Sequence, residues 1–316
     1  MIRVVALFLL GALLGACARS PLVPMESAQL PARVELKQTP FFPQEDYQCG
    51  PAALATVLTQ RGIDTDPERL VERVYIPKRK GSLQVEMVAA ARAHDLLVYP
   101  VSPRLESVLA EVAAGNPVLV LQNLAFDRWP QWHFAVVVGY DLVDQTIVLR
   151  SGTTRRWVGS FRQFERSWMK ADRWAVVTTR PDVFPATAEE TVWLKAASDL
   201  EQTGRVEAAH RAYQASADRW SSGLSWFALG NSAYAQGDKA GAERALRQSI
   251  EREGQFAAGW FNLSHVLAER GCKRQAHAAK ACAARLSPSD ARFASGELPD
   301  SGEPPGVCGP LPPCPN

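Results

Sequence analysis

The sequence lacks a strong charge of either sign, because 35 Lys and Arg residues nearly balance 33 Asp and Glu residues, for a net charge of +2. No basic stripe is present, so the composition does not indicate binding to nucleic acid or another polyanion. The five histidines and six cysteines do not show the spacing of metal ligands, and neither common phosphate-binding loop occurs. We therefore expect no cofactor and no metal ion.

Hydrophobic runs long enough to cross a membrane are missing as well. The apolar run at residues 4–14 is too short for a permanent span. It follows Arg3 and precedes small residues, which is typical of a secretory signal peptide. Because the chain has 316 residues and is 47% hydrophobic, two domains with real cores can follow.

The end of this apolar run resembles a bacterial lipobox, Leu-Gly-Ala-Cys at residues 14–17. The resemblance implies that residues 1–17 are a lipoprotein signal peptide and that Cys17 is the lipidated first residue of the mature protein. Ala18 follows where an Asp would retain such a protein in the inner membrane, which implies an outer-membrane lipoprotein facing the periplasm. We expect membrane contact through this lipid alone. Residues 18–40 contain four prolines and are predicted to be an extended tether.

A single cysteine, Cys49, stands directly before a predicted helix. Gly50 and Pro51 form its entry turn, apolar residues then recur at helical spacing, and Gly62 ends it. A thiol at a helix N-terminus faces unpaired N–H groups and the positive end of the helix dipole, which favour the thiolate. We interpret Cys49 as a candidate nucleophile; the alternative is a small buried core residue.

Two other residues favour the nucleophile. Gln44 lies five residues upstream, where its amide can join the Cys49 N–H in holding an oxyanion. His133 directly precedes a strongly apolar predicted strand, Phe134–Tyr140. A cysteine and a distant histidine that the fold brings together are typical of cysteine peptidases.

These two segments carry a resemblance to a known family. Residues 44–54 and 133–141 are similar to the bacteriocin-leader-processing peptidases, a branch of the papain superfamily, and the likeness extends over about residues 44–180. The chain resembles still more closely a group of bacterial lipoproteins in which such a domain precedes tetratricopeptide repeats. The resemblance implies a papain-like domain at residues 41–180 with Cys49 as nucleophile, His133 as base and Gln44 in the oxyanion hole.

The third catalytic group departs from the family pattern. The resemblance places an Asp at the end of the strand after the histidine, where this chain has Ser151. A hydroxyl there can accept from the imidazole but stabilises imidazolium less than a carboxylate does. Asn123 is a second candidate, Asp141 is expected to lie too far along its strand, and Gln48 remains an alternative to Gln44.

The predicted elements of this domain run from helices to strands. Helices are expected after Gly50, Asp66, Gly81 and Pro103, and one over Phe161–Met169. Predicted strands lie at residues 96–101, 117–121, 134–140, 146–150, 156–160 and 174–179. This order favours an α+β fold with a mostly antiparallel sheet.

The second half of the chain repeats with a period of 33 or 34 residues after a linker at residues 181–188. Tryptophans, glycines and alanines recur in register: Trp193, Trp226 and Trp260; Gly204, Gly237 and Gly271; Ala209, Ala242 and Ala276; and Ala212, Ala245 and Ala279. The pattern predicts three tetratricopeptide repeats at residues 189–290, an all-α solenoid whose concave groove suits peptides or proteins. We expect the tryptophans to be packing residues.

The Gly/Pro-rich tail at residues 291–316 is predicted to lack regular structure. It holds Cys308 and Cys314, and a periplasmic destination permits disulfides. Cys272 and Cys282 are about 13–15 Å apart if one helix contains both, which is too far for a bridge. The tail cysteines can therefore pin the tail to the last helix or close on each other.

Together these features predict a lipid-anchored periplasmic cysteine peptidase that hydrolyses peptide bonds through a thioester, with repeats that bind a substrate protein or an adaptor. A catalytically inactive peptide-binding scaffold and an amidase acting on cell-wall peptides are the alternatives.

Overall fold

The computed structural model describes residues 22–23, 29–44, 48–294, 297–300 and 307–315. The predicted signal peptide and Cys17 lie outside these residues. Among the described residues, none of the helices combines the length and the hydrophobicity needed to cross a membrane.

The helices are α2 (Cys49–Gln60), α3 (Pro67–Val74), α4 (Gln84–Arg92), α5 (Leu105–Ala113), α6 (Phe161–Met169), α7 (Glu190–Gln202), α8 (Val206–Trp220), α9 (Gly223–Ala235), α10 (Lys239–Arg252), α11 (Ala257–Glu269), α12 (Lys273–Leu286) and α13 (Ala291–Ala294). The strands are β1 (Arg33–Glu35), β2 (Leu97–Pro100), β3 (Val118–Asn123), β4 (Trp132–Asp141), β5 (Thr146–Ser151), β6 (Thr154–Ser160) and β7 (Ala175–Thr179).

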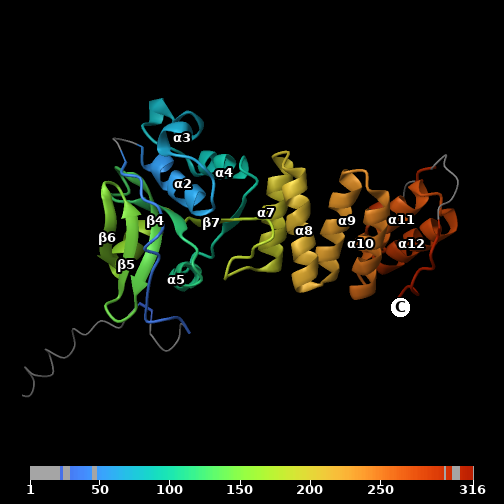
Figure 1. Cartoon of the computed structure of the whole chain (residues 1–316). Helices are drawn as coiled ribbons and strands as arrows, with labels where there is room; N and C mark the ends of the chain where they lie inside the picture. Colours follow the sequence, from blue (N-terminus) through green and yellow to red (C-terminus); the bar gives the residue numbers. More distant parts are fainter. Residues whose placement is uncertain (1–21, 24–28, 45–47, 295–296, 301–306, 316) are drawn as a thin grey trace, which may run out of the picture.

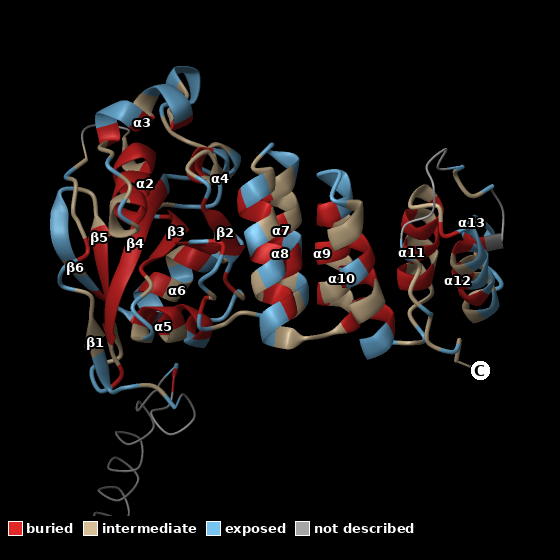
Figure 2. Ribbon diagram, turned by 45° about the vertical axis from the view of Figure 1, so that its right-hand side comes forward, coloured by how far each residue is buried: buried red, intermediate tan, exposed pale blue. Residues whose placement is uncertain are grey.

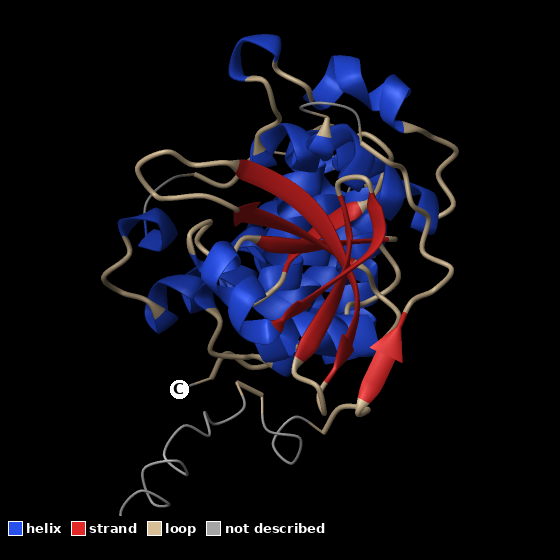
Figure 3. Ribbon diagram, turned by 90° about the vertical axis from the view of Figure 1, so that its left-hand side faces the viewer, coloured by secondary structure: helices blue, strands red, loops and turns tan. Residues whose placement is uncertain are grey.

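The N-terminal half is an α+β domain around one antiparallel sheet, as the order of elements predicts. The strand order is β2-β7-β3-β4-β5-β6, with β1 pairing with β4. Every pairing is antiparallel, and the strands twist across one another in Figure 3. Short connections such as the β4–β5 turn suit antiparallel neighbours, whereas parallel strands need long crossovers.

Strand β1 corrects the predicted tether. Arg33 pairs with Asp141 and Glu35 with Gly139, so the end of residues 18–40 is part of the sheet. A Cβ on Gly139 would lie 2.7 Å from the Val34 carbonyl oxygen, so β1 can approach β4 this closely only at a glycine. The domain therefore begins before residue 41.

Both faces of the sheet are covered, which explains the nearly continuous apolar runs of its central strands (Figure 2). On one face, Leu54 and Leu58 of α2 pack with Leu121 and Val136. On the other face α5 and α6 lie against β4 and β3. Helix α2 thus lies across β4, the strand that carries His133.

The C-terminal half consists of helices in antiparallel pairs stacked in a row (Figure 1). Helices α7, α9 and α11 start at residues 190, 223 and 257, the same steps as the sequence repeat. The three repeated glycines end the first helix of each pair with φ between 77° and 80°, a left-handed conformation that favours glycine. Trp193 and Trp260 are buried, in agreement with a packing role.

The two halves share a core at the junction of β2 and α7. Leu97 and Tyr99 belong to the same buried cluster as Trp193 and Ala197. The linker between them is held by Glu111, a fully buried carboxylate. Glu111 accepts from the backbone N–H groups of Ala186 (3.1 Å) and Thr187 (2.7 Å) and from the Thr187 hydroxyl. The Tyr99 hydroxyl donates to the Thr187 carbonyl oxygen at 3.0 Å, and the linker is thereby fixed to the first domain.

Two disulfides pin the C-terminal tail to the last helical pair. Cys272, at the N-cap of α12, bonds Cys308, and Cys282 within α12 bonds Cys314. Of the pairings left open by the sequence, the structure has the one that attaches the tail to the helix. Arg247 adds hydrogen bonds to the tail carbonyls of Pro310 (2.7 Å) and Gly309 (3.1 Å).

Candidate active site

Cys49 is the first residue of α2, one residue earlier than the entry turn at Gly50 and Pro51 predicts. No side chain caps this end of the helix, because Gln48 makes no capping hydrogen bond with its side chain. The N–H groups of Cys49 and Gly50 are in the first turn, where no intrahelical acceptor exists, and Pro51 has none to offer. The start of α2 therefore presents donors and a half-buried thiol at one place.

Close packing at Gly50 fixes the position of this thiol. A Cβ at Gly50 would lie 2.2 Å from the Ser82 Oγ and 2.6 Å from its Cβ, so only glycine fits. Because α2 is also buried along most of its length, its first turn cannot move without disturbing the core.

Burial raises the pKa of the Cys49 thiol, and this corrects the expectation of a resting thiolate. Hydrogen bonds from the backbone of Phe134, Gly50 and Cys49 itself act in the opposite direction and lower its pKa, but desolvation is the larger effect. The helix N-terminus therefore does not ionise the thiol by itself. The hydrogen bond from the Phe134 backbone places the sulfur beside that residue, which follows His133 in the chain.

His133 lies at the start of β4 and is held by β5. Its Nε2 is 2.8 Å from the Ser151 Oγ, at the end of the neighbouring strand. Burial lowers the pKa of the His133 imidazole, because the charged form loses hydration. The contact fits the tautomer with the proton on Nε2, which donates to the hydroxyl and leaves Nδ1 as an acceptor. Burial thus favours the neutral form of both the Cys49 thiol and the His133 imidazole.

Of the candidates for the third residue of the site, Ser151 contacts His133. Asn123 does not: it pairs in register with Trp132, and its Oδ1 accepts from the N–H groups of Ala125 and Gln131. Asp141 lies at the far end of β4, where it accepts from the N–H groups of Val143 and Asp144 and pairs with Arg33.

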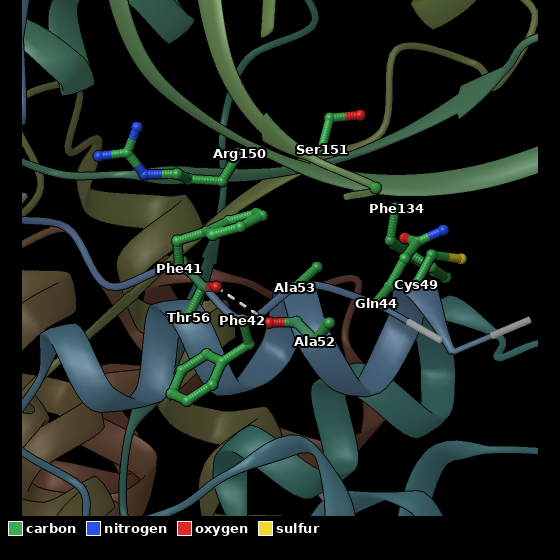
Figure 4. A pocket seen from close by; sticks show the side chains of 11 residues that line it. Phe41, Phe42, Gln44, Cys49, Ala52, Ala53, Thr56, Phe134, Arg150 and Ser151 are labelled. Atoms are coloured by element: carbon green, nitrogen blue, oxygen red, sulfur yellow. Dashed lines mark hydrogen bonds between the residues drawn. The ribbon is translucent and has the colours of Figure 1, made fainter. Parts of the chain in front are cut away.

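Gln44 reaches the same pocket as Cys49. Its backbone N–H donates to the Gly152 carbonyl oxygen at 3.3 Å, which ties the segment before α2 to the β5–β6 turn. Figure 4 shows the Gln44 amide beside the Cys49 sulfur. Ser151 and Phe134 line this pocket too. It has a volume of about 10 Å³, so it accommodates an atom the size of a carbonyl oxygen and no side chain. Gln48 lies at the N-cap and does not line the pocket.

Arg150 supports the pocket and was not found from the sequence. Only 5% of it is exposed, yet no carboxylate of the described residues forms an ion pair with it. Its guanidinium donates instead to the backbone carbonyls of Leu36, Lys37, Thr39 and Arg155. Arg150 therefore holds the segment that leads to Gln44 against the strand that carries Ser151. An arginine in an apolar strand is the available signal, but three of its four partner residues lie more than a hundred positions away.

The other four histidines lie elsewhere. His94 follows α4, and His210, His265 and His277 lie in the helical half. Among the described residues no group of three or more His, Cys, Asp or Glu side chains could hold a metal ion.

Ser151 variants test the state of the imidazole through the pH profile of kcat/KM. Since burial lowers the pKa of His133, we expect activity to persist below pH 6.5 and to fall when the ring takes up its proton. Ser151→Asp places a carboxylate at Nε2, raises the pKa of His133 and moves this acid limb to higher pH. Ser151→Ala removes one neutral hydrogen bond and lowers kcat/KM by up to about tenfold. An acid limb at the same pH in Ser151→Asp would contradict the assignment.

Comparison with known proteins identifies the first domain. Residues 36–176 match the model described as the Peptidase_C39 like family. None of the curated proteins matches the chain. A putative C39-like peptidase from Bacillus anthracis is 16% identical with a TM-score of 0.40, over 48% of this chain and 98% of that one.

Two further solved structures resemble part of the chain. One is a double glycine motif protease from an AMS/PCAT transporter in complex with the leader peptide (19% identity, TM-score 0.33, 45% of this chain and 91% of that one). The other is the peptidase domain of Streptococcus ComA, a bifunctional ABC transporter (18% identity, TM-score 0.34, 44% and 96%). The family match therefore supports a C39-like peptidase domain at residues 36–176.

Proposed function

We propose that this protein is a cysteine peptidase in which Cys49 attacks a peptide carbonyl with His133 as its base. The observation that carries the proposal is the hydrogen bond between His133 Nε2 and Ser151, a residue that lines the same pocket as the Cys49 thiol. This bond leaves Nδ1 to accept the thiol proton as the carbon–sulfur bond forms. The imidazolium then gives that proton to the leaving amine. A water molecule, deprotonated by the same ring, hydrolyses the thioester.

The oxyanion of each tetrahedral intermediate is held by the N–H of Cys49 and the side-chain amide of Gln44. The uncapped first turn of α2 supplies the backbone donor, and Figure 4 shows the amide beside the sulfur. Because the thiol and the imidazole start neutral, charge separates only as the nucleophile attacks. Fixed donors at the oxyanion then offset part of that cost.

We further propose that the helical half is a tetratricopeptide-repeat solenoid that recruits a substrate protein or an adaptor. The 33- and 34-residue spacing of its helical pairs and its three turn glycines support this. Lipidation at Cys17 would place the protein on the outer membrane, facing the periplasm. Two disulfides in the tail suit an oxidising compartment of this kind.

Labelling of Cys49 with a thiol-directed peptidyl epoxide tests the proposed chemistry. Cys49 is the free thiol among the described cysteines, so the labelled peptide is easily identified. We expect prompt modification of the wild type and a large loss of rate in His133→Ala, because the neutral thiol then has no base. Labelling of native Cys49 no faster than of the unfolded protein would favour the alternative, a non-catalytic peptide-binding scaffold.

A further inference from the structure

Ser151 also lines a second cavity. It has a volume of about 410 Å³ and, unlike the pocket at Cys49, is large enough for a side chain. Helix α6 and the ends of β3 and β5 form it; its lining includes Gln122, Leu149, Trp157, Arg166 and Lys170.

Two residues that line this cavity are neighbours of His133. Ser151, which bonds the imidazole, lines both this cavity and the pocket at Cys49. Gln122, on the opposite wall, is the register partner of His133 in the β3–β4 pairing. A group bound here is therefore next to the residue that holds the imidazole.

The lining has an apolar floor and a cationic rim. Leu149 is buried and Trp157 half-buried, whereas Arg166 and Lys170 reach the rim from α6. No Asp or Glu lines the cavity. The Lys170 ammonium donates to the Ala125 carbonyl oxygen at 2.6 Å and is 3.9 Å from the Asp127 carboxylate. These contacts with the β3–β4 loop partly neutralise its charge. Arg166 has no ion-pair partner among the described residues.

We propose that this cavity is a substrate subsite that binds a carboxylate, with Arg166 as the residue that selects it. The inference rests on the proposed peptidase function and adds a substrate preference to it. A planar guanidinium with free donors binds a carboxylate in bidentate fashion. The apolar floor contacts the stem that carries the acid. An Asp or Glu side chain and a C-terminal carboxylate both have this chemistry.

Binding to the inactive variant Cys49→Ala separates the subsite from catalysis. The probes are acetylated alanine hexapeptide amides with a single Glu, or a single Gln, at each position in turn, and the Gln peptides remade with a free C-terminal carboxylate. Calorimetric titration gives Kd for each pair. We expect one Glu position, or the free C-terminus, to bind about tenfold more tightly than its neutral partner, as a charge-assisted contact at a half-open site predicts.

The matched variants each remove one arginine from α6. Arg166→Gln changes a residue that lines the cavity, and Arg162→Gln, the control, changes one that does not. Arg166→Gln should abolish the tenfold preference, Arg166→Lys should keep part of it, and Arg162→Gln should leave it unchanged. Equal Kd values for acidic and neutral probes, no binding of any probe, or equal losses in the two Gln variants would overturn the proposal. If wild-type Cys49 is inert to the epoxide but the preference is present, the peptidase function fails and the subsite stands.

Discussion

Replacing His133 by Ala is expected to lower kcat/KM for peptide hydrolysis by about 10³-fold or more. Burial raises the pKa of Cys49, so little thiolate exists at neutral pH without a base to take the proton. His133 is the base in the proposed mechanism, and its Nε2 is already held by Ser151. Cys49→Ala should remove at least as much activity, because the nucleophile itself is lost. Both rates are measured with the same quenched fluorescent peptide pool.

The matched control is His94→Ala. His94 is half-buried in the turn after α4, and burial lowers its pKa as it does that of His133. Loss of a histidine of similar character, outside the pocket, should leave kcat/KM within about twofold, since it touches no reacting atom. If both histidine variants lost activity equally, the loss would report general destabilisation, and the base would not be His133.

Removing the two tail disulfides is expected to give the largest loss of stability of any change considered. The bridges close loops with sequence separations of 36 and 32 residues. Each is worth about 4 kcal/mol in the chain-entropy account of such loops. The tail covers the exposed side of the last helical pair, where Cys308, Leu311 and Cys314 pack on its core. Cys308→Ser with Cys314→Ser should therefore expose that end of the stack.

Chemical denaturation followed by circular dichroism measures this loss, with and without a reductant. We expect the double variant and the reduced wild type to unfold their helical half at lower denaturant concentration, and the labelling of Cys49 to stay unchanged. Unfolding of all helices and strands in a single transition at the wild-type midpoint would show that the bridges contribute nothing.

Local signals in the sequence predicted much of this fold. Helix α2 has its glycine–proline start and its apolar spacing, and both act within a few residues. The repeated glycines at 204, 237 and 271 mark turns because they adopt positive φ, which is again a local property. Such features need no knowledge of distant contacts.

The features that the sequence did not predict depend on contacts between distant segments. Strand β1 has three residues, and its partner β4 lies about a hundred positions away. Arg150 satisfies carbonyls of residues 36–39, which no local pattern reveals. The raised pKa of Cys49 follows from burial in the finished fold, which outweighs the helix N-terminus. For the third residue of the site the sequence leaves Ser151, Asn123 or none, and the strand register and the hydrogen bond to His133 distinguish Ser151 from Asn123.

The most direct test of a nucleophilic Cys49 paired with His133 is to trap the thioester. A peptidyl p-nitrophenyl ester is mixed with the protein, the reaction is quenched in acid at successive times, and the digested protein is analysed by mass spectrometry. The proposed mechanism predicts an acyl group on the peptide that contains Cys49, formed and hydrolysed in the wild type and formed at least about 10²-fold more slowly in His133→Ala. Acylation at another residue, or equal rates in the two proteins, would contradict it.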